Sequence, residues 1–448
     1  MPGRRSTLAA VAAVVALATA SACGGDNQAT GPAPAPSATP TSLSQVSLWV
    51  YGPSQVVTAY TEIARNFTHD HPETVVNVSP FGSVDAARTA LTKAIAEGDP
   101  PDAFLAPAQD VSSLVASGAV QRLDDLLGKR EVDFGDGFQR IALEEFSLDN
   151  ALQCMPVDVS PLVVYYNTDL VDLSQLTDPD DPPIVAADGW NLEQFAEAAR
   201  LASSDRARGL YVAPTLEQVA PFVLAGGGSV VDNVVNPTTL RLSDGSSVSA
   251  LEQLLEIVRN PQLTYDQAQI AATPALERFE AGQLGMILGY RDLTPRLRAS
   301  GVSFGVMPLP ADGTRATVGQ GSGLCLSSTS NHVDQAADFI AYVASKNGSS
   351  VLAETGFVVP TNLDAEHSDA FLQPGRQPVD AAVFSSNVRY IQPLPTVPAW
   401  TKAAAAAAPE LTDLFYDPVI DPLRARLEAI DKDSLDRFAA PLTTTPAP

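Results

Sequence analysis

Strand-like and helix-like segments alternate at the start of the globular part of the chain, and this alternation is the strongest constraint on the fold. Short apolar runs that are typical of β-strands lie at 47–51, 75–78 and 102–105. Between them, apolar residues recur at helical spacing within 56–67 and 84–95. A βαβαβ order of this kind predicts a parallel sheet covered by helices.

The ends of these predicted strands are the first candidate positions for a ligand site. In open α/β sheets, ligands bind beyond the carboxyl ends of the strands. The segments that follow the three strands are 52–55, 79–83 and 106–110.

The length and the net charge of the chain limit the number of lobes and the kinds of partner that we expect. The chain has 448 residues, of which 45% are hydrophobic and 18% charged. The segment from about 45 to 448 is too long for one hydrophobic core, so we expect two lobes. The formal net charge of -25 makes nucleic acid a poor partner, because phosphate binding needs clustered Lys and Arg.

The N-terminus has the pattern of an export signal. Arg4 and Arg5 precede an apolar run at 8–17, which is too short to cross a bilayer. Small residues then lead to Cys23, and this order resembles a bacterial lipobox. We interpret 1–22 as a signal peptide and Cys23 as a lipidated residue; the alternative is a plain secretory peptide with Cys23 as a bystander.

The segment that follows Cys23 is rich in Gly, Pro, Ala, Ser and Thr. It contains too little apolar surface to offset its ordering entropy, so we expect 23–44 to be a disordered tether. The sequence after it has no apolar run long enough to cross a membrane.

Two further cysteines, Cys154 and Cys325, remain if Cys23 carries a lipid. In an exported protein they could form a disulfide, and two buried free thiols fit the sequence equally well.

Motifs of catalysis and of metal or cofactor binding are missing from the sequence, so we expect no enzyme, no metal and no cofactor. There is no P-loop, and the chain has only four His. The segment 69–71 (His-Asp-His) reads as a solvated turn rather than a metal site. Tyr165 and Tyr166 could be read as a tyrosine pair that binds ferric iron, but they lie in a strand-like run, where one ring faces the core and the next faces out, so core packing is the favoured interpretation.

Motifs from residue 101 onward resemble those of a known family. In order they are PDAFL (101–105) with LDDLL (123–127), MPVDV (155–159) with VYYNTDL (164–170), GWNLEQF (189–195), FEAGQLGM (279–286), MPLP (307–310) with GQGSG (319–323), and PLPTVPAW (393–400). This order resembles the family 1 extracellular solute-binding proteins, the maltose-type binding proteins of ABC importers. The resemblance extends from about residue 45 to 440.

The resemblance implies an α/β, two-lobed periplasmic-binding-protein fold with hinge crossover strands and an interlobe ligand cleft. The lobes would comprise 45–154 plus 325–375 and 157–322 plus 376–445. In this family the crossover strands run side by side, which would place Cys154 and Cys325 where a disulfide can form.

The resemblance also implies a function. The protein would capture a carbohydrate or a phosphorylated polyol by hinge closure and deliver it to an ABC permease, while Cys23 anchors it to the outer face of the cytoplasmic membrane. The alternative is the same fold used as a ligand sensor or a partner-binding surface lipoprotein.

Candidate ligand contacts follow from the strand ends and from the resemblance. Those of the first lobe and the crossover strands are Ser54, Gln55, Phe81, Gln109, Asp110, Asp158, Ser160 and Gln320. Those of the second lobe are Glu217, Gln218, Gly227, Gly228, Tyr290, Arg291, Asp292 and Trp400.

Chemistry assigns roles to some of these residues. Tyr290 and Trp400 could stack on a sugar ring, although relatives often carry a tryptophan near position 290. Arg291 could pair with a carboxylate or phosphate. The glycines at 226–228 could admit close backbone approach to a ligand, or form a loop that needs positive φ.

Overall fold

The computed structural model describes residues 43–176 and 184–439. The predicted signal peptide, Cys23, nearly all of the tether and residues 440–445 lie outside the described residues. The described residues group into one compact unit. No helix within the described ranges is both long enough and apolar enough to cross a membrane.

The first sheet has the predicted parallel start. Strands β1 (Ser44–Tyr51), β2 (Thr74–Phe81) and β3 (Ala103–Pro107) are parallel, and the full order is β2-β1-β3-β11-β6. The crossover strands β6 (Cys154–Pro161) and β11 (Gly319–Leu326) complete it in antiparallel pairing. The βαβαβ prediction is therefore confirmed.

Helices α1 (Ser54–Asp70), α2 (Val84–Glu97) and α3 (Val111–Ala116) connect or follow these strands. The apolar face of α1 is buried, as its spacing predicted. Ser83 caps the start of α2 by accepting a hydrogen bond from the Ala86 amide at 3.2 Å. Gly98 ends α2 with a left-handed φ of 75°.

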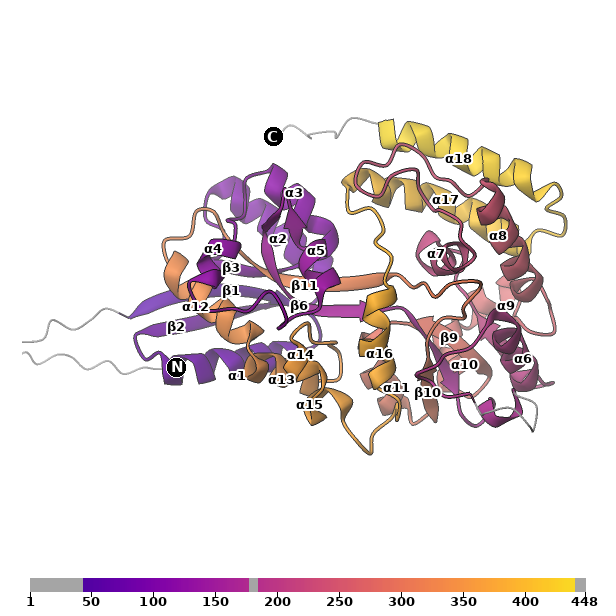
Figure 1. The fold of residues 1–448 in the computed structure, drawn as a ribbon, viewed down its shortest axis with the longest axis horizontal. Helices are drawn as coiled ribbons and strands as arrows, with labels where there is room; N and C mark the ends of the chain where they lie inside the picture. The colour runs from indigo at the N-terminus through magenta and orange to yellow at the C-terminus, as the bar shows by residue number, and fades with distance from the viewer. Residues whose placement is uncertain (1–42, 177–183, 440–448) are drawn as a thin grey trace, which may run out of the picture. The chain divides into compact units, whose positions relative to one another are not determined.

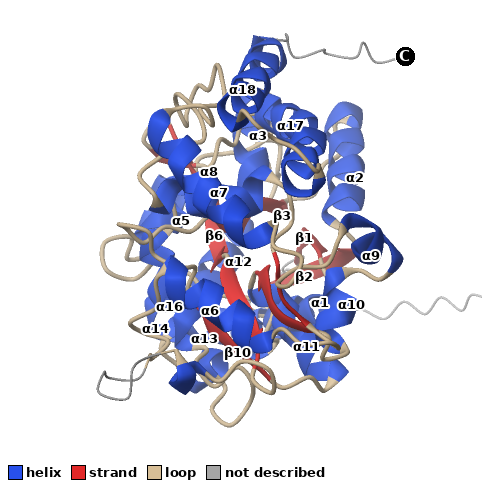
Figure 2. Ribbon diagram, turned by 90° about the vertical axis from the view of Figure 1, so that its right-hand side faces the viewer, coloured by secondary structure: helices blue, strands red, loops and turns tan. Residues whose placement is uncertain are grey.

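The second sheet has the order β10-β7-β9-β8. Its strands are β7 (Val163–Asn167), β8 (Arg208–Tyr211), β9 (Leu284–Gly289) and β10 (Phe304–Met307). Tyr165 and Tyr166 are buried in β7, which confirms their predicted place in the core. Figure 2 shows the strands in the interior with helices around them.

The remaining elements are mostly helical. In the first half they are η1 (Ala108–Asp110), α4 (Asp124–Gly128), α5 (Arg140–Glu145), β4 (Ser147–Leu148), β5 (Ala151–Leu152), η2 (Leu173–Gln175), α6 (Leu192–Ala202) and α7 (Leu216–Ala225). In the middle of the chain they are α8 (Gly245–Val258), α9 (Gln267–Ala272), α10 (Ala275–Glu280), η3 (Arg291–Leu293) and α11 (Thr294–Ser300). The last ones are α12 (Val333–Ala344), α13 (Lys346–Glu354), α14 (Leu363–Glu366), α15 (Asp369–Leu372), α16 (Ala382–Asn387), η4 (Val388–Tyr390), α17 (Pro398–Tyr416) and α18 (Leu423–Ala439).

Two hydrophobic cores correspond to two lobes, one around each large sheet. Strand β6 passes from one to the other, because Met155 and Val157 belong to the first core and Val159 to the second. Figure 1 shows β6 and β11 running from the first sheet toward the second. The two-lobed α/β fold is thus confirmed, while the exact lobe boundaries stay a prediction.

A disulfide joins Cys154 and Cys325. The two residues are direct partners in the β6–β11 ladder, and both side chains belong to the first core. The pairing implied by the family resemblance is therefore confirmed. It links the crossover strands on the side of the first lobe and leaves residues 156–161 and 319–323 outside the linkage.

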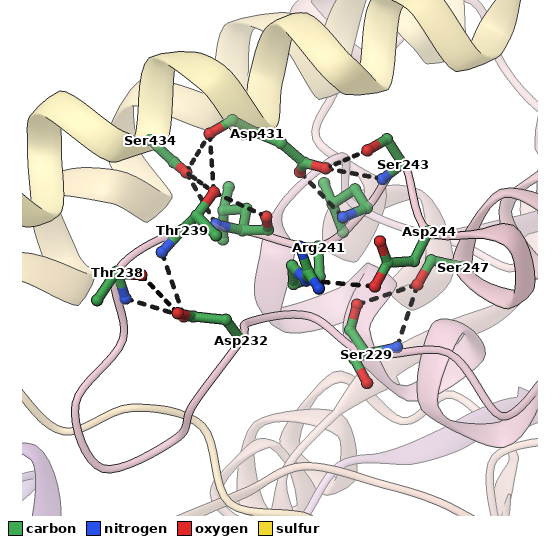
Figure 3. A network of polar contacts seen from close by, with 12 residues as sticks. Ser229, Asp232, Thr238, Thr239, Arg241, Ser243, Asp244, Ser247, Asp431 and Ser434 are labelled. Atoms are coloured by element: carbon green, nitrogen blue, oxygen red, sulfur yellow. Dashed lines mark hydrogen bonds and ion pairs between the residues drawn. The ribbon is translucent and has the colours of Figure 1, made fainter.

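Buried polar groups attach the C-terminal helix α18 to the second lobe (Figure 3). The Asp431 carboxylate accepts hydrogen bonds from the amides of Leu242 and Ser243, both at 2.9 Å, and from the Ser243 hydroxyl at 2.6 Å. The Ser434 hydroxyl accepts one from the Leu240 amide at 2.8 Å. These bonds satisfy backbone donors that the strand-free segment 239–243 cannot pair by itself.

Candidate functional site

A cavity of about 1160 Å³ lies between the two lobes. The carboxyl ends of β1, β3 and β9 reach it, as expected for parallel strands in α/β sheets. Tyr60 and Leu105 of the first core line one wall. Leu216 of the second core and Trp400, which packs against that core, line the other.

The crossover strands line the cavity between these walls through Asp158 of β6 and Gln320 of β11. The hydroxyls of Ser112 and Thr396, one from each wall, lie 3.2 Å apart and hydrogen-bond to each other. The cavity is therefore formed by both lobes together, which is the arrangement that hinge closure on a ligand requires.

Carboxylates dominate the charged groups of the cavity. Glu144, Glu145, Asp158, Glu217 and Asp292 line it. No Lys, Arg or His occurs among its lining residues within 43–176 and 184–439. The lining is consequently rich in hydrogen-bond acceptors and negative charge.

Burial shifts the ionisation of three of these carboxylates. It raises the pKa of Asp158 to about 8, although the Val359 amide, which donates to Asp158 Oδ1 at 2.7 Å, opposes the shift. Burial raises the pKa of Glu145 to about 7. Burial also raises the pKa of Asp292, against a hydrogen bond from Gln320. The cavity thus leaves these carboxylates short of compensating charge.

Aromatic side chains supply the apolar part of the lining. Trp400 near the start of α17 and Tyr290 just after β9 are both partly exposed to the cavity. The Tyr290 hydroxyl donates to Glu217 Oε1, and burial together with Glu217 raises the pKa of Tyr290 well above its ordinary value. Ring faces beside carboxylate acceptors form an amphipathic surface suited to a polar ring compound.

Several residues predicted from the sequence meet in this cavity. They are Gln109, Asp158, Glu217, Tyr290, Asp292, Gln320 and Trp400.

Four predicted residues of the first lobe do not line the cavity. Ser54 and Gln55 are exposed at the start of α1 and hydrogen-bond to each other at 3.2 Å. Phe81 packs against Trp49, with ring centroids 5.0 Å apart. Asp110 is paired with Arg88 through contacts of 2.9 and 3.1 Å, so its carboxylate is already occupied.

Ser160 and Arg291 are buried on the side of the second lobe. The Ser160 hydroxyl accepts a hydrogen bond from the Arg291 amide at 2.9 Å, because β6 has left the cavity at this point. The Arg291 side chain is fully buried, with its guanidinium 4.9 Å from the centre of the Phe371 ring and 5.1 Å from that of Phe384. Arg291 therefore cannot take the anion-pairing role that the sequence suggested without leaving the core.

Three further predicted residues have roles in local structure. They are Gln218, Gly227 and Gly228. The Gln218 side chain accepts a hydrogen bond from the Ala213 amide at 2.6 Å. Gly227 has a φ of 74°, which favours the positive-φ alternative for this loop. A Cβ on Gly228 would lie 2.7 Å from the Ser247 hydroxyl, so close packing excludes a side chain there.

Glu144 and Glu145 line the cavity and were not predicted from the sequence. Both lie at the end of the short helix α5, a segment for which no element was predicted. A pair of acids between apolar neighbours was a visible signal, but only the tertiary fold turns the end of this helix toward the cavity. Tyr51, at the end of β1, was also missed.

The predicted solvated turn contains His69, whose side chain is 88% exposed. No cluster of three or more His, Cys, Asp or Glu suited to a metal ion occurs in the described part of the chain.

Solved structures share this fold. The sugar-binding protein MalE from Xanthomonas citri superposes with a TM-score of 0.75 at 15% identity, covering 88% of this chain and 98% of that one. An ABC substrate-binding protein from Listeria monocytogenes in complex with cycloalternan gives 0.72 at 19% identity, with coverages of 88% and 98%. The GacH receptor of Streptomyces glaucescens, known unliganded and with acarbose, gives 0.70 at 18% identity with the same coverages.

Sequence comparison agrees with the fold. A putative binding protein of Brucella abortus is 20% identical over 387 residues, which is 83% of this chain and 90% of the relative. Residues 62–375 match the family model described as bacterial extracellular solute-binding protein. This match spans well over half of the chain, and the chain therefore belongs to the family of bacterial extracellular solute-binding proteins.

Proposed function

We propose that this protein is the receptor of an ABC import system, which captures a carbohydrate between its lobes by hinge closure and delivers it to a permease. The observation that carries the proposal is the interlobe cavity, in which Trp400 and Tyr290 lie beside carboxylate acceptors. A sugar presents C–H faces that suit aromatic rings and hydroxyl donors that suit carboxylates. Ligand contacts from both lobes would favour the closed state.

The comparisons support a carbohydrate as the ligand class. The structures of similar fold include receptors in complex with cycloalternan and with acarbose. Their sequence identity to this chain is below 20%, so they indicate a class of ligand and leave the particular compound open.

Membrane attachment is part of the same proposal. Lipidation of Cys23 followed by a tether at 23–44 would hold the receptor at the outer face of the cytoplasmic membrane, near a permease. Replacing Cys23 with Ser should release the exported protein from the membrane fraction. Retention of that variant in the membrane fraction would contradict the anchor.

Thermal unfolding with a panel of solutes tests the ligand class. A ligand at about 100 times its dissociation constant stabilises the folded state by about 2.7 kcal/mol, which for a domain of this size raises the Tm by about 3 °C. We expect a saccharide to produce this shift. A shift with amino acids, peptides or ferric iron and with no saccharide would overturn the proposal.

A further inference from the structure

We propose that the solute is a saccharide that carries a positive charge on an amino group, and that the carboxylates of the interlobe cavity bind this ammonium group. This inference rests on the proposed function and names the substrate class of the same site. It is carried by the balance of charge and of hydrogen-bond partners in the cavity.

The cavity lining contains several acidic side chains and no basic one. Five carboxylates line it, and the lining contains no Lys, Arg or His within the described residues. A solute enclosed between the lobes would displace the water that solvates these groups. A buried acid avoids an unpaired charge either by keeping its proton or by pairing with a cation, and an ammonium group of the solute would supply that cation.

Among the five acidic residues of the lining, only Glu144 pairs with an arginine within the described residues. Arg140 bonds to Glu144 at 2.9 Å, and its own side chain is 90% exposed. Arg88 bonds to Asp110 at 2.9 Å and to Asp85 at 2.8 Å. Glu145, Asp158 and Asp292 have no ion-pair partner in the described part of the chain.

Unused acceptor atoms are available at the centre of the site. Glu145 makes no side-chain hydrogen bond within the described residues, and its carboxylate lies against Gly321 of β11. Asp158 uses Oδ1 to accept from the Val359 amide, and its Oδ2 has no hydrogen-bond partner within the described residues. An ammonium group has three donors, and charge-assisted hydrogen bonds to such oxygens are stronger than those of a hydroxyl.

The ionisation of these residues points in the same direction. Burial raises the pKa values of Asp158 to about 8 and of Glu145 to about 7, which shows that their charged forms lack stabilising partners. In the empty cavity Asp158 is therefore mostly protonated at pH 7 and Glu145 about half protonated, and a cationic ligand would stabilise the charged forms and lower both pKa values.

Anionic solutes fit this site poorly. The phosphorylated polyol considered from the sequence relied on Arg291, and this side chain is fully buried between Phe371 and Phe384. The cavity lining has no basic group, so a phosphate would meet five acidic side chains and no cation.

Two disaccharides that differ only in charge test the inference. The β-1,4-linked dimer of glucosamine has free amines, and N,N′-diacetylchitobiose has neutral acetamides on the same rings. Isothermal titration calorimetry should measure affinities for both at a pH where the amines are protonated. We expect the amine to bind at least about tenfold more tightly, because its hydrogen bonds are charge-assisted.

Isosteric variants of two cavity residues test whether these residues cause the preference for the amine. Glu145→Gln and Asp158→Asn remove one charge each and resemble the protonated forms, so they should fold normally. Each should reduce the preference for the amine over the acetamide by about tenfold. Glu252→Gln, which changes an exposed carboxylate on α8 outside the cavity, should leave that preference unchanged.

The outcomes separate this inference from the proposed function. Equal or tighter binding of N,N′-diacetylchitobiose or maltose would overturn the cationic solute and leave the saccharide receptor standing. Binding of spermidine or glucose 6-phosphate with neither disaccharide nor maltose would overturn both. A preference for the amine that survives in both isosteric variants would also overturn the inference.

Discussion

The proposed role of Trp400 in ligand binding can be tested with little effect on the stability of the fold. It lies partly exposed at the cavity and packs only peripherally on the second core. We expect Trp400→Ala to weaken saccharide binding about tenfold through loss of ring stacking, with a nearly unchanged Tm. Titration calorimetry and thermal unfolding measure the two effects.

Trp190 provides the matched control for Trp400. Its side chain is 4% exposed and its indole N–H donates to the Pro308 carbonyl at 2.9 Å. Trp190→Phe should lower the Tm and leave affinity for the saccharide intact. The stacking role of Trp400 is refuted if its Ala variant binds as tightly as the wild type.

A residue could be placed at the cavity from the sequence when it directly follows the end of a strand. Gln109 follows β3 and Tyr290 follows β9, and both reach the cavity as expected. Arg291, one residue later, is turned into the core, because residues 291–293 form a turn of 3-10 helix after the strand. The direction of the Arg291 side chain depends on this local backbone geometry, which residue type alone does not reveal.

At the scale of elements, Asp431 is the main polar attachment of α18. Asp431→Ala leaves the amides of Leu242 and Ser243 without their acceptor, and each buried orphan donor costs about 1–3 kcal/mol. We therefore expect the free energy of unfolding to fall by about 2–5 kcal/mol in urea titrations. The exposed neighbour Asp436 is the control, and an equal loss in Asp436→Ala would contradict the role of Asp431.

The disulfide between β6 and β11 should contribute to stability more than to binding. It closes a sequence separation of 171 residues, and removal of a native disulfide typically costs about 2–5 kcal/mol. We expect the Cys154→Ala/Cys325→Ala double variant to unfold at a lower urea concentration while it keeps its affinity for the saccharide. A loss of affinity with unchanged stability would be the opposite of this expectation.

The elements of the first lobe were largely predictable because their signals are local. The apolar spacing of α1 can be recognised within one short stretch of sequence. The same holds for the N-cap of α2 and for Gly98 at its end. Helix α5 was not predicted, since six residues carry too little periodicity to identify a helix. Its two glutamates were consequently absent from the predicted site.

At the scale of the whole molecule, the buried carboxylates predict how stability depends on pH. Their folded-state pKa values, about 8 for Asp158 and about 7 for Glu145, exceed unfolded values of about 4. Between these limits the folded state binds more protons, so the free energy of unfolding should fall as the pH rises from about 5 to 8.

Urea midpoints measured across this range test the pH dependence. The Glu145→Gln/Asp158→Asn double variant should show a shallower decline, because both titrating groups are gone. An equally steep decline in the double variant would assign the effect to other groups, such as Asp292.

Closure of the two lobes on a saccharide is the central claim, and solution X-ray scattering tests it most directly. The radius of gyration should be measured for the protein alone and at saturation with the saccharide that stabilises it most. We predict a smaller radius on saturation, and for Trp400→Ala the same decrease at an about tenfold higher saccharide concentration. An unchanged radius in the saturated wild-type protein would contradict capture of the saccharide between the lobes.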